Sequence, residues 1–169
     1  MNGDALNRLC DEGRLRRLSP SAGAARSIWD GIGTDLRSAA LLLGQKGELQ
    51  DTGRAHECAY DAVFKGVVAI LRCLGFRLGA MEQRVAAVQA LRAILDDPGH
   101  AGLMTDFDRM REKRNSVAYE GGKTTILEAK EAIETAHSLL NLLRPVYEQE
   151  LARTFRGDRG PGPKEGGRR

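Results

Sequence analysis

Apolar residues recur every three or four positions along several long stretches of this 169-residue chain. Such steps bring side chains to one face of a helix. No run alternates between apolar and polar residues for long enough to predict a strand. The pattern therefore predicts an all-α fold, an antiparallel bundle of four to five helices. One clear stripe comprises Ala25, Ile28, Trp29, Ile32, Leu36, Ala39, Ala40 and Leu43.

Capping signals mark where most of these helices begin and end. Ser19 and Pro20 predict an N-terminus, Asp51 another, and Gly75 predicts a C-terminus. Thr125 and Glu128 have the spacing of a capping box, in which each side chain bonds the other residue's free N–H. The expected helices cover residues 4–12, 19–44, 52–74, 81–95, 101–114 and 125–155, with a kink at Pro145.

The same signals divide the chain into three parts. Residues 1–18 form a short helix and a lead-in, and residues 19–155 form the helical bundle. Residues 156–169 are rich in Gly, Pro and Arg, a composition typical of a disordered tail.

Composition limits the classes of function. With 26 basic and 23 acidic residues, the net charge of +3 does not indicate a dedicated nucleic-acid binder. The three cysteines lack metal-ligand spacing, so reduced thiols are expected, with Cys58 and Cys73 in apolar helical runs. No stretch resembles a membrane span or a signal peptide. A cytoplasmic protein without a metal or other cofactor is therefore expected.

Familiar catalytic motifs are absent from the sequence, and its three histidines are far apart. What stands out is a basic cluster in which four cations occupy six positions: Arg109, Arg111, Lys113 and Arg114. Arg114 follows Met110 by four residues, which places it beside the apolar stripe. A half-buried arginine needs an acidic partner or an anion. The cluster is thus either a phosphate site or a structural ion-pair network with Asp106, Asp108 and Glu112.

The segment that follows, Arg114-Asn115-Ser116-Val117-Ala118-Tyr119, resembles the motif of the HEPN superfamily, in which an arginine and a polar residue precede a histidine. The segment Ala59-Tyr60-Asp61-Ala62-Val63-Phe64-Lys65 is similar to the corresponding family helix. Residues 11–15 and 107–111 resemble one uncharacterised bacterial branch of that superfamily. The resemblance covers residues 1–150 or so.

This resemblance implies a HEPN-like bundle that forms a homodimer, with paired motifs facing one another in a cleft. Active members hold an RNA phosphate with the arginine and cleave the RNA without metal. The implied catalytic positions are Arg114, Asn115 and Tyr119, and we assign Arg109, Arg111, Asp61 and Lys65 to substrate binding. Tyr119 stands where the family has histidine, and a phenol titrates at about pH 10, so it is a poor base at neutral pH.

Three functions follow as hypotheses. The first is a toxin- or defence-type component that binds RNA or a nucleotide phosphate in a dimeric cleft. The second is an active metal-independent endoribonuclease. The third is a non-enzymatic dimeric scaffold for protein interactions. In this superfamily, non-enzymatic proteins whose cleft binds a nucleotide, an RNA end or a partner protein often pair with a small nucleotidyltransferase.

Overall fold

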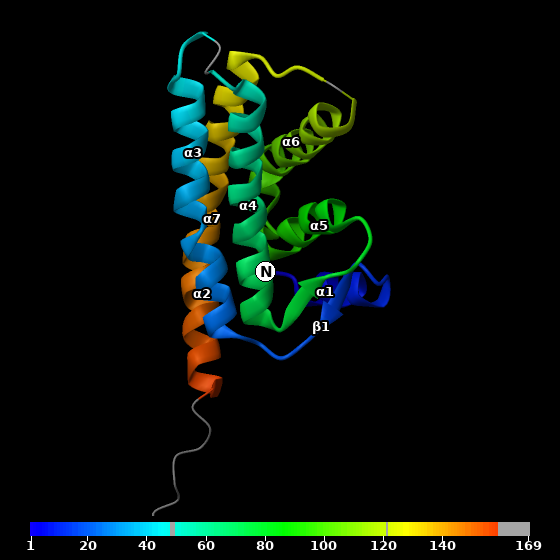
Figure 1. The fold of residues 1–169 in the computed structure, drawn as a ribbon. Coiled ribbons are helices and arrows are strands. Elements are labelled where there is room, and N and C mark those ends of the chain that lie inside the picture. Colours follow the sequence, from blue (N-terminus) through cyan, green and yellow to red (C-terminus); the bar gives the residue numbers. More distant parts are fainter. Residues whose placement is uncertain (48–49, 121, 159–169) are drawn as a thin grey trace, which may run out of the picture.

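The protein is built mostly of helices, which make up 79% of the computed structural model (Figure 1). The structure describes residues 1–47, 50–120 and 122–158, apart from the side chains of residues 118–120 and 157–158. The helices are α1 (Gly3–Asp11), α2 (Ala22–Asp30), α3 (Ile32–Gly44), α4 (Thr52–Leu74), α5 (Gln83–Leu95), the short 3₁₀ helix η2 (Pro98–His100), α6 (Ala101–Glu120) and α7 (Ile126–Asp158). The prediction of a mainly helical fold is confirmed.

Several helix ends form as their capping residues predict. The carboxylate of Asp51 accepts a hydrogen bond from the backbone N–H of Arg54 at 2.8 Å and starts α4. Gly75 ends α4 with φ +78°, and a Cβ on it would lie 2.8 Å from the carbonyl oxygen of Leu18. The Thr125 N–H donates to Glu128 at 2.7 Å, and the Glu128 N–H donates to the Thr125 hydroxyl at 3.2 Å. This capping box starts α7.

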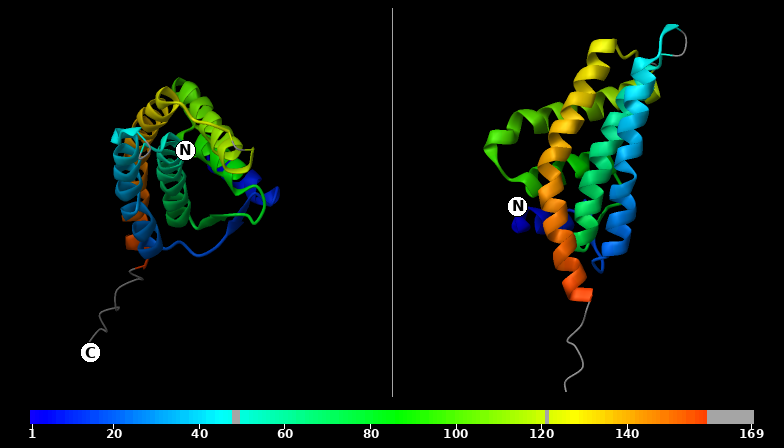
Figure 2. Two further views of the ribbon diagram at one scale, coloured as in Figure 1. Left: turned by 45° about the horizontal axis from the view of Figure 1, so that its top comes forward. Right: turned by 90° about the vertical axis from the view of Figure 1, so that its left-hand side faces the viewer.

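The direction of the helices differs in part from the prediction. α3 and α4 are antiparallel neighbours, but α4 and α7 run in the same direction (Figures 1 and 2). Hydrogen bonds join them at both ends: the Thr52 hydroxyl donates to the Thr124 carbonyl at 2.6 Å, and the Thr154 hydroxyl donates to the Cys73 carbonyl at 3.0 Å. The arrangement is possible because α5 and α6 lie between α4 and α7 in the chain and cross beside them. A fully antiparallel bundle was therefore the wrong expectation.

The core lies between α4 and the helices around it. Tyr60 of α4 is fully buried and stacks on Phe107 of α6, with 5.1 Å between ring centroids. Gly66 lets α7 approach closely, because a Cβ there would lie 3.1 Å from the Leu140 side chain and 3.2 Å from that of Leu143. α4 thus supports both α6 and α7, the helices that carry the candidate site.

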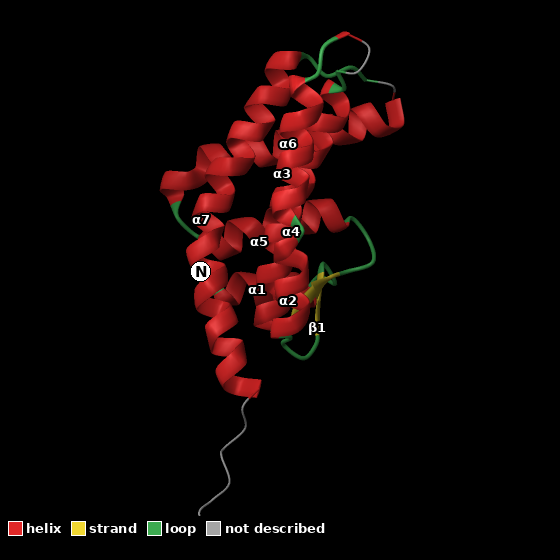
Figure 3. Cartoon of the chain, turned by 60° about the vertical axis from the view of Figure 1, so that its left-hand side comes forward, coloured by secondary structure: helices red, strands yellow, loops and turns green. Residues whose placement is uncertain are grey.

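A small antiparallel sheet and a helix break were not predicted. β1 (Leu15–Arg17) pairs with β2 (Phe76–Leu78), as shown in yellow in Figure 3. Strands of three residues are too short to show an alternating pattern. The expected helix over residues 19–44 is two helices that meet at Gly31, and Ser21 rather than Ser19 caps the first.

Other boundaries differ less. α6 continues past Arg114 to Glu120, and α7 continues through Pro145 and beyond Phe155 to Asp158. The predicted disordered tail falls, from residue 159, outside the described residues. None of the helices in the described part of the chain has an apolar stretch that could cross a lipid bilayer.

Candidate functional site

Arg114 lies against α4, close to the apolar core. Its Nη2 donates to Oε1 of Glu57 at 2.7 Å, and its side chain is 13% exposed. Its Nε is buried and has no hydrogen-bond partner among the described residues. The expectation of a half-buried arginine with an acidic partner is confirmed. The partner, however, comes from α4, whereas the predicted partners Asp106, Asp108 and Glu112 lie on α6 itself.

Glu57 holds two guanidinium groups. In addition to Arg114, it accepts a hydrogen bond from Arg54, which is largely exposed. One carboxylate thus lies between two arginines, and Asp61 is a second carboxylate close to both of them. The contact also fixes one edge of the Arg114 guanidinium and leaves its Nη1 group without a hydrogen-bond partner among the described residues.

Asp61 and Tyr60 extend this polar environment along α4. Burial, followed by the charge of Glu57, raises the pKa of Asp61, whereas the charge of Arg114 lowers it. The Tyr60 hydroxyl is buried without a hydrogen-bond partner among the described residues, and burial raises its pKa above the usual range. We call Glu57, Tyr60, Asp61 and Arg114 the Arg114 cluster.

The other predicted basic residues point elsewhere. Arg111 is 16% exposed and is bonded to Asp108 at 2.7 Å and to Glu112 at 3.1 Å. Lys65 pairs with Asp35 of α3 at 2.6 Å rather than with Asp61. The structure therefore places both cations in structural ion pairs.

Arg109 and the remaining motif residues are also separated. Arg109 is 73% exposed and pairs with Asp106 at 3.1 Å. Asn115 is half-buried, and its side chain makes no hydrogen bond among the described residues. The backbone of Tyr119 belongs to α6, but its side chain lies outside the described residues. Of the predicted site residues, Asp61 and Arg114 are thus brought together in the Arg114 cluster.

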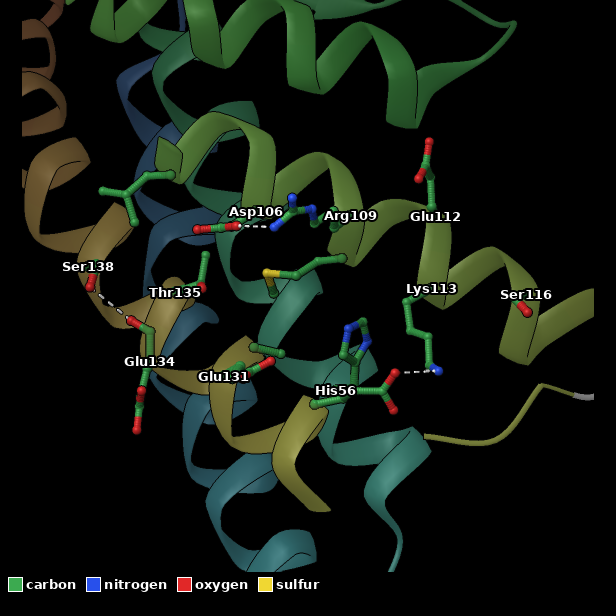
Figure 4. Close-up of a pocket in the computed structure, with 14 residues that line it drawn as sticks. His56, Asp106, Arg109, Glu112, Lys113, Ser116, Glu131, Glu134, Thr135 and Ser138 are labelled. Atoms are coloured by element: carbon green, nitrogen blue, oxygen red, sulfur yellow. Dashed lines mark hydrogen bonds and ion pairs between the residues drawn. The ribbon is translucent and has the colours of Figure 1, made fainter. Parts of the chain in front are cut away.

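A second feature, which the sequence did not indicate, is a groove of about 800 Å³ between α6 and α7 (Figure 4). Arg109, Glu112 and Lys113 line it from α6, and Glu131 and Glu134 line it from α7. Arg114 is not among its lining residues. We call this cavity the α6–α7 groove.

His56 of α4 forms part of the base of the α6–α7 groove. His56 is 3% exposed, and its side chain makes no hydrogen bond among the described residues. Burial lowers its pKa from 6.5 to about 4. Glu128 opposes this shift and Lys113 adds to it, and the imidazole is neutral at pH 7. The sequence did contain a signal for this burial, because His56 precedes Ala59 and Tyr60 by three and four residues on one helix face.

An ion pair between α6 and α7 forms part of the lining of the groove. Lys113 of α6 lies 2.7 Å from Glu128 of α7. The hydrogen bond from Lys113, together with that from the Thr125 N–H, lowers the pKa of Glu128 to about 2. The capping box and this ion pair thus share one carboxylate, which fixes the start of α7 against α6.

Comparisons of the chain with family models, curated proteins and solved structures give no significant match. Among the described residues, no group of three or more His, Cys, Asp or Glu side chains is arranged to hold a metal ion. The three cysteines are unpaired thiols, and burial raises the pKa of Cys73 to about 11. The Arg114 cluster and the α6–α7 groove are therefore the features of the structure that bear on function.

Proposed function

We propose that the protein binds a phosphate group of RNA or of a nucleotide through Arg114. The observation that carries this proposal is the state of that side chain: its guanidinium is almost buried, bonded on one edge to Glu57, and has a buried Nε without a partner among the described residues. An arginine that is fixed on one edge presents its other donors in a constant orientation. Phosphate oxygens are the acceptors that such a planar fork matches best.

The neighbouring charges are balanced around Arg114. Glu57 and Asp61 offset the charges of Arg54 and Arg114, so a phosphate would be recognised by the hydrogen-bond geometry of the guanidinium rather than by net charge. Asn115 follows Arg114 on α6 and makes no hydrogen bond among the described residues, so its amide remains able to donate to the same ligand.

The resemblance to the HEPN superfamily supports a dimeric arrangement of this site. In that arrangement the paired motifs of two chains face one another in a cleft, and each chain contributes one Arg114. A paired site of this kind would bind two phosphates of one RNA strand. The proposal is for binding and does not depend on Tyr119.

The test is binding of a fluorescent single-stranded RNA and of ATP to the full chain, measured by polarisation and by calorimetry. We expect Arg114→Lys to weaken binding about tenfold, because it keeps the charge and loses the fork. Arg109→Lys is the matched control, since Arg109 is exposed and lies on another side of the same helix. Equal loss in the two variants, or no loss in Arg114→Lys, would contradict the proposal.

The same RNA, incubated with the protein in the presence of a chelator, distinguishes binding from cleavage. Intact RNA that stays bound supports the binding function. Cleavage that is lost in Arg114→Lys and retained in Arg109→Lys would replace it with the endoribonuclease function. An Arg114→Lys variant that is less stable but binds RNA normally would leave the scaffold function.

A further inference from the structure

A separate site lies in the α6–α7 groove, and none of its lining residues belongs to the Arg114 cluster. Five carboxylate side chains line the groove against two cationic ones. Both cations are already engaged, Arg109 by Asp106 and Lys113 by Glu128, and Glu112 is engaged by Arg111, which does not line the groove. Glu131 and Glu134 form no ion pair among the described residues. The groove therefore favours a cation.

The base of the groove has a different character from its rim. Leu103, Met110 and Ala132 line it with apolar surface. Among them lies His56, which is almost completely buried and makes no hydrogen bond among the described residues. Figure 4 shows the His56 ring next to Lys113, within the space that the lining side chains enclose. A neutral imidazole has one nitrogen that accepts a hydrogen bond, and here that acceptor has no partner in the described part of the chain.

The form of the groove selects among cations. Its residues extend from Leu103 to Ser116 on α6, a distance of about 20 Å along a helix. The carboxylates are distributed along this length, and no three of the described metal-ligating side chains surround one point. A linear molecule with cationic nitrogens separated by methylene chains matches this distribution better than a metal ion does. Its methylene groups can lie on the apolar base while its nitrogens reach the carboxylates.

We propose that the α6–α7 groove binds a linear aliphatic polyamine. Ammonium groups of the ligand pair with Glu131 and Glu134, and one of them donates a hydrogen bond to the neutral imidazole of His56. The volume of about 800 Å³ is within the range of small-molecule sites. This proposal rests on residues outside the Arg114 cluster, so it does not depend on the proposed phosphate binding.

The test is a calorimetric titration of the full chain with spermidine at physiological salt. We expect saturable binding of one molecule per chain. The double variant Glu131→Gln/Glu134→Gln removes two charges from the exposed rim without changing side-chain size, and we expect about tenfold weaker binding. The matched control is Glu12→Gln/Glu148→Gln, which removes the same charge from exposed residues that do not line the groove.

A second measurement reports on the base of the groove. In an NMR titration with spermidine, the ring signals of His56 should shift, while those of the exposed His137 should stay constant. Thr135→Lys, which places a tethered ammonium group in the groove, should abolish both the shift and the binding. Equal binding by the two double variants, or an unchanged His56 signal, would overturn the proposal. Tenfold tighter binding of a lysine-rich peptide than of spermidine would assign the groove to a protein partner instead, which also overturns it.

Discussion

Two sides of α6 use charge in opposite ways. On the side that faces α4, Arg114 is closely packed, 13% exposed and held by one carboxylate from another helix. On the side that faces α7, Lys113 and Glu128 form a more exposed pair above an open groove. Adjacent residues of one basic cluster thus have different environments. The ion-pair partner and the exposure of each cation therefore depend on the neighbouring helix, rather than on its position in the basic cluster.

The largest expected effect concerns His56 at the base of the groove. The folded protein keeps this imidazole neutral down to about pH 4, whereas the unfolded chain takes up its proton at about pH 6.5. Because the unfolded state binds more protons between these values, the free energy of unfolding falls as the pH is lowered through this range. We expect a loss of about 3 kcal/mol in total, measured by urea unfolding at a series of pH values.

The variant His56→Gln should lose the part of this dependence that lies between pH 7 and pH 5, where carboxylates contribute little. His137→Gln, on the exposed face of α7, should retain it. A slope that survives in His56→Gln would show that another group causes it, and the prediction of a buried, neutral His56 at the base of the groove would be contradicted.

The next effect concerns the other side of α6. Glu57→Ala leaves the Arg114 guanidinium near the core without its carboxylate partner. A buried charge without a partner destabilises the folded state. Because Glu57 is 23% exposed and Arg114 13% exposed, solvent reduces that cost, and we expect about 2 kcal/mol of destabilisation in urea unfolding. Glu57→Gln, which keeps a hydrogen-bond acceptor, should lose less.

Arg54→Ala is the control, because it removes the exposed partner of the same carboxylate. We expect a change below about 0.5 kcal/mol. If Arg54→Ala destabilises the protein as much as Glu57→Ala does, the buried contact with Arg114 contributes no more to the free energy of unfolding than the exposed contact with Arg54.

The smallest effect concerns the start of α7. Thr125→Ala removes the hydroxyl that accepts a hydrogen bond from the Glu128 N–H at 3.2 Å. Loss of such a cap costs about 1 kcal/mol, which thermal unfolding can measure. Thr105→Ala removes a hydroxyl that bonds a carbonyl within its own helix, and it should change stability by less than about 0.5 kcal/mol. Similar losses in the two variants would remove the special role of Thr125.

Local features of the fold were predictable, and long-range ones were not. Asp51, Gly75 and Thr125 act through their own backbone neighbours, so their roles can be derived from sequence alone. The pairing of Glu57 with Arg114 joins residues that are 57 positions apart, and no local pattern encodes it. The same limit applies to the pairing of β1 with β2 and to the groove, which exists only once α6 and α7 are placed side by side.

The shared direction of α4 and α7 has a consequence for how the chain folds. Parallel neighbours cannot be joined by a short turn, so their interface connects residues as far apart as Cys73 and Thr154, a separation of 81 positions. The intervening loop must be closed before this contact contributes any stability. We therefore expect a higher relative contact order, and slower folding, than in an up-and-down helical bundle of equal length.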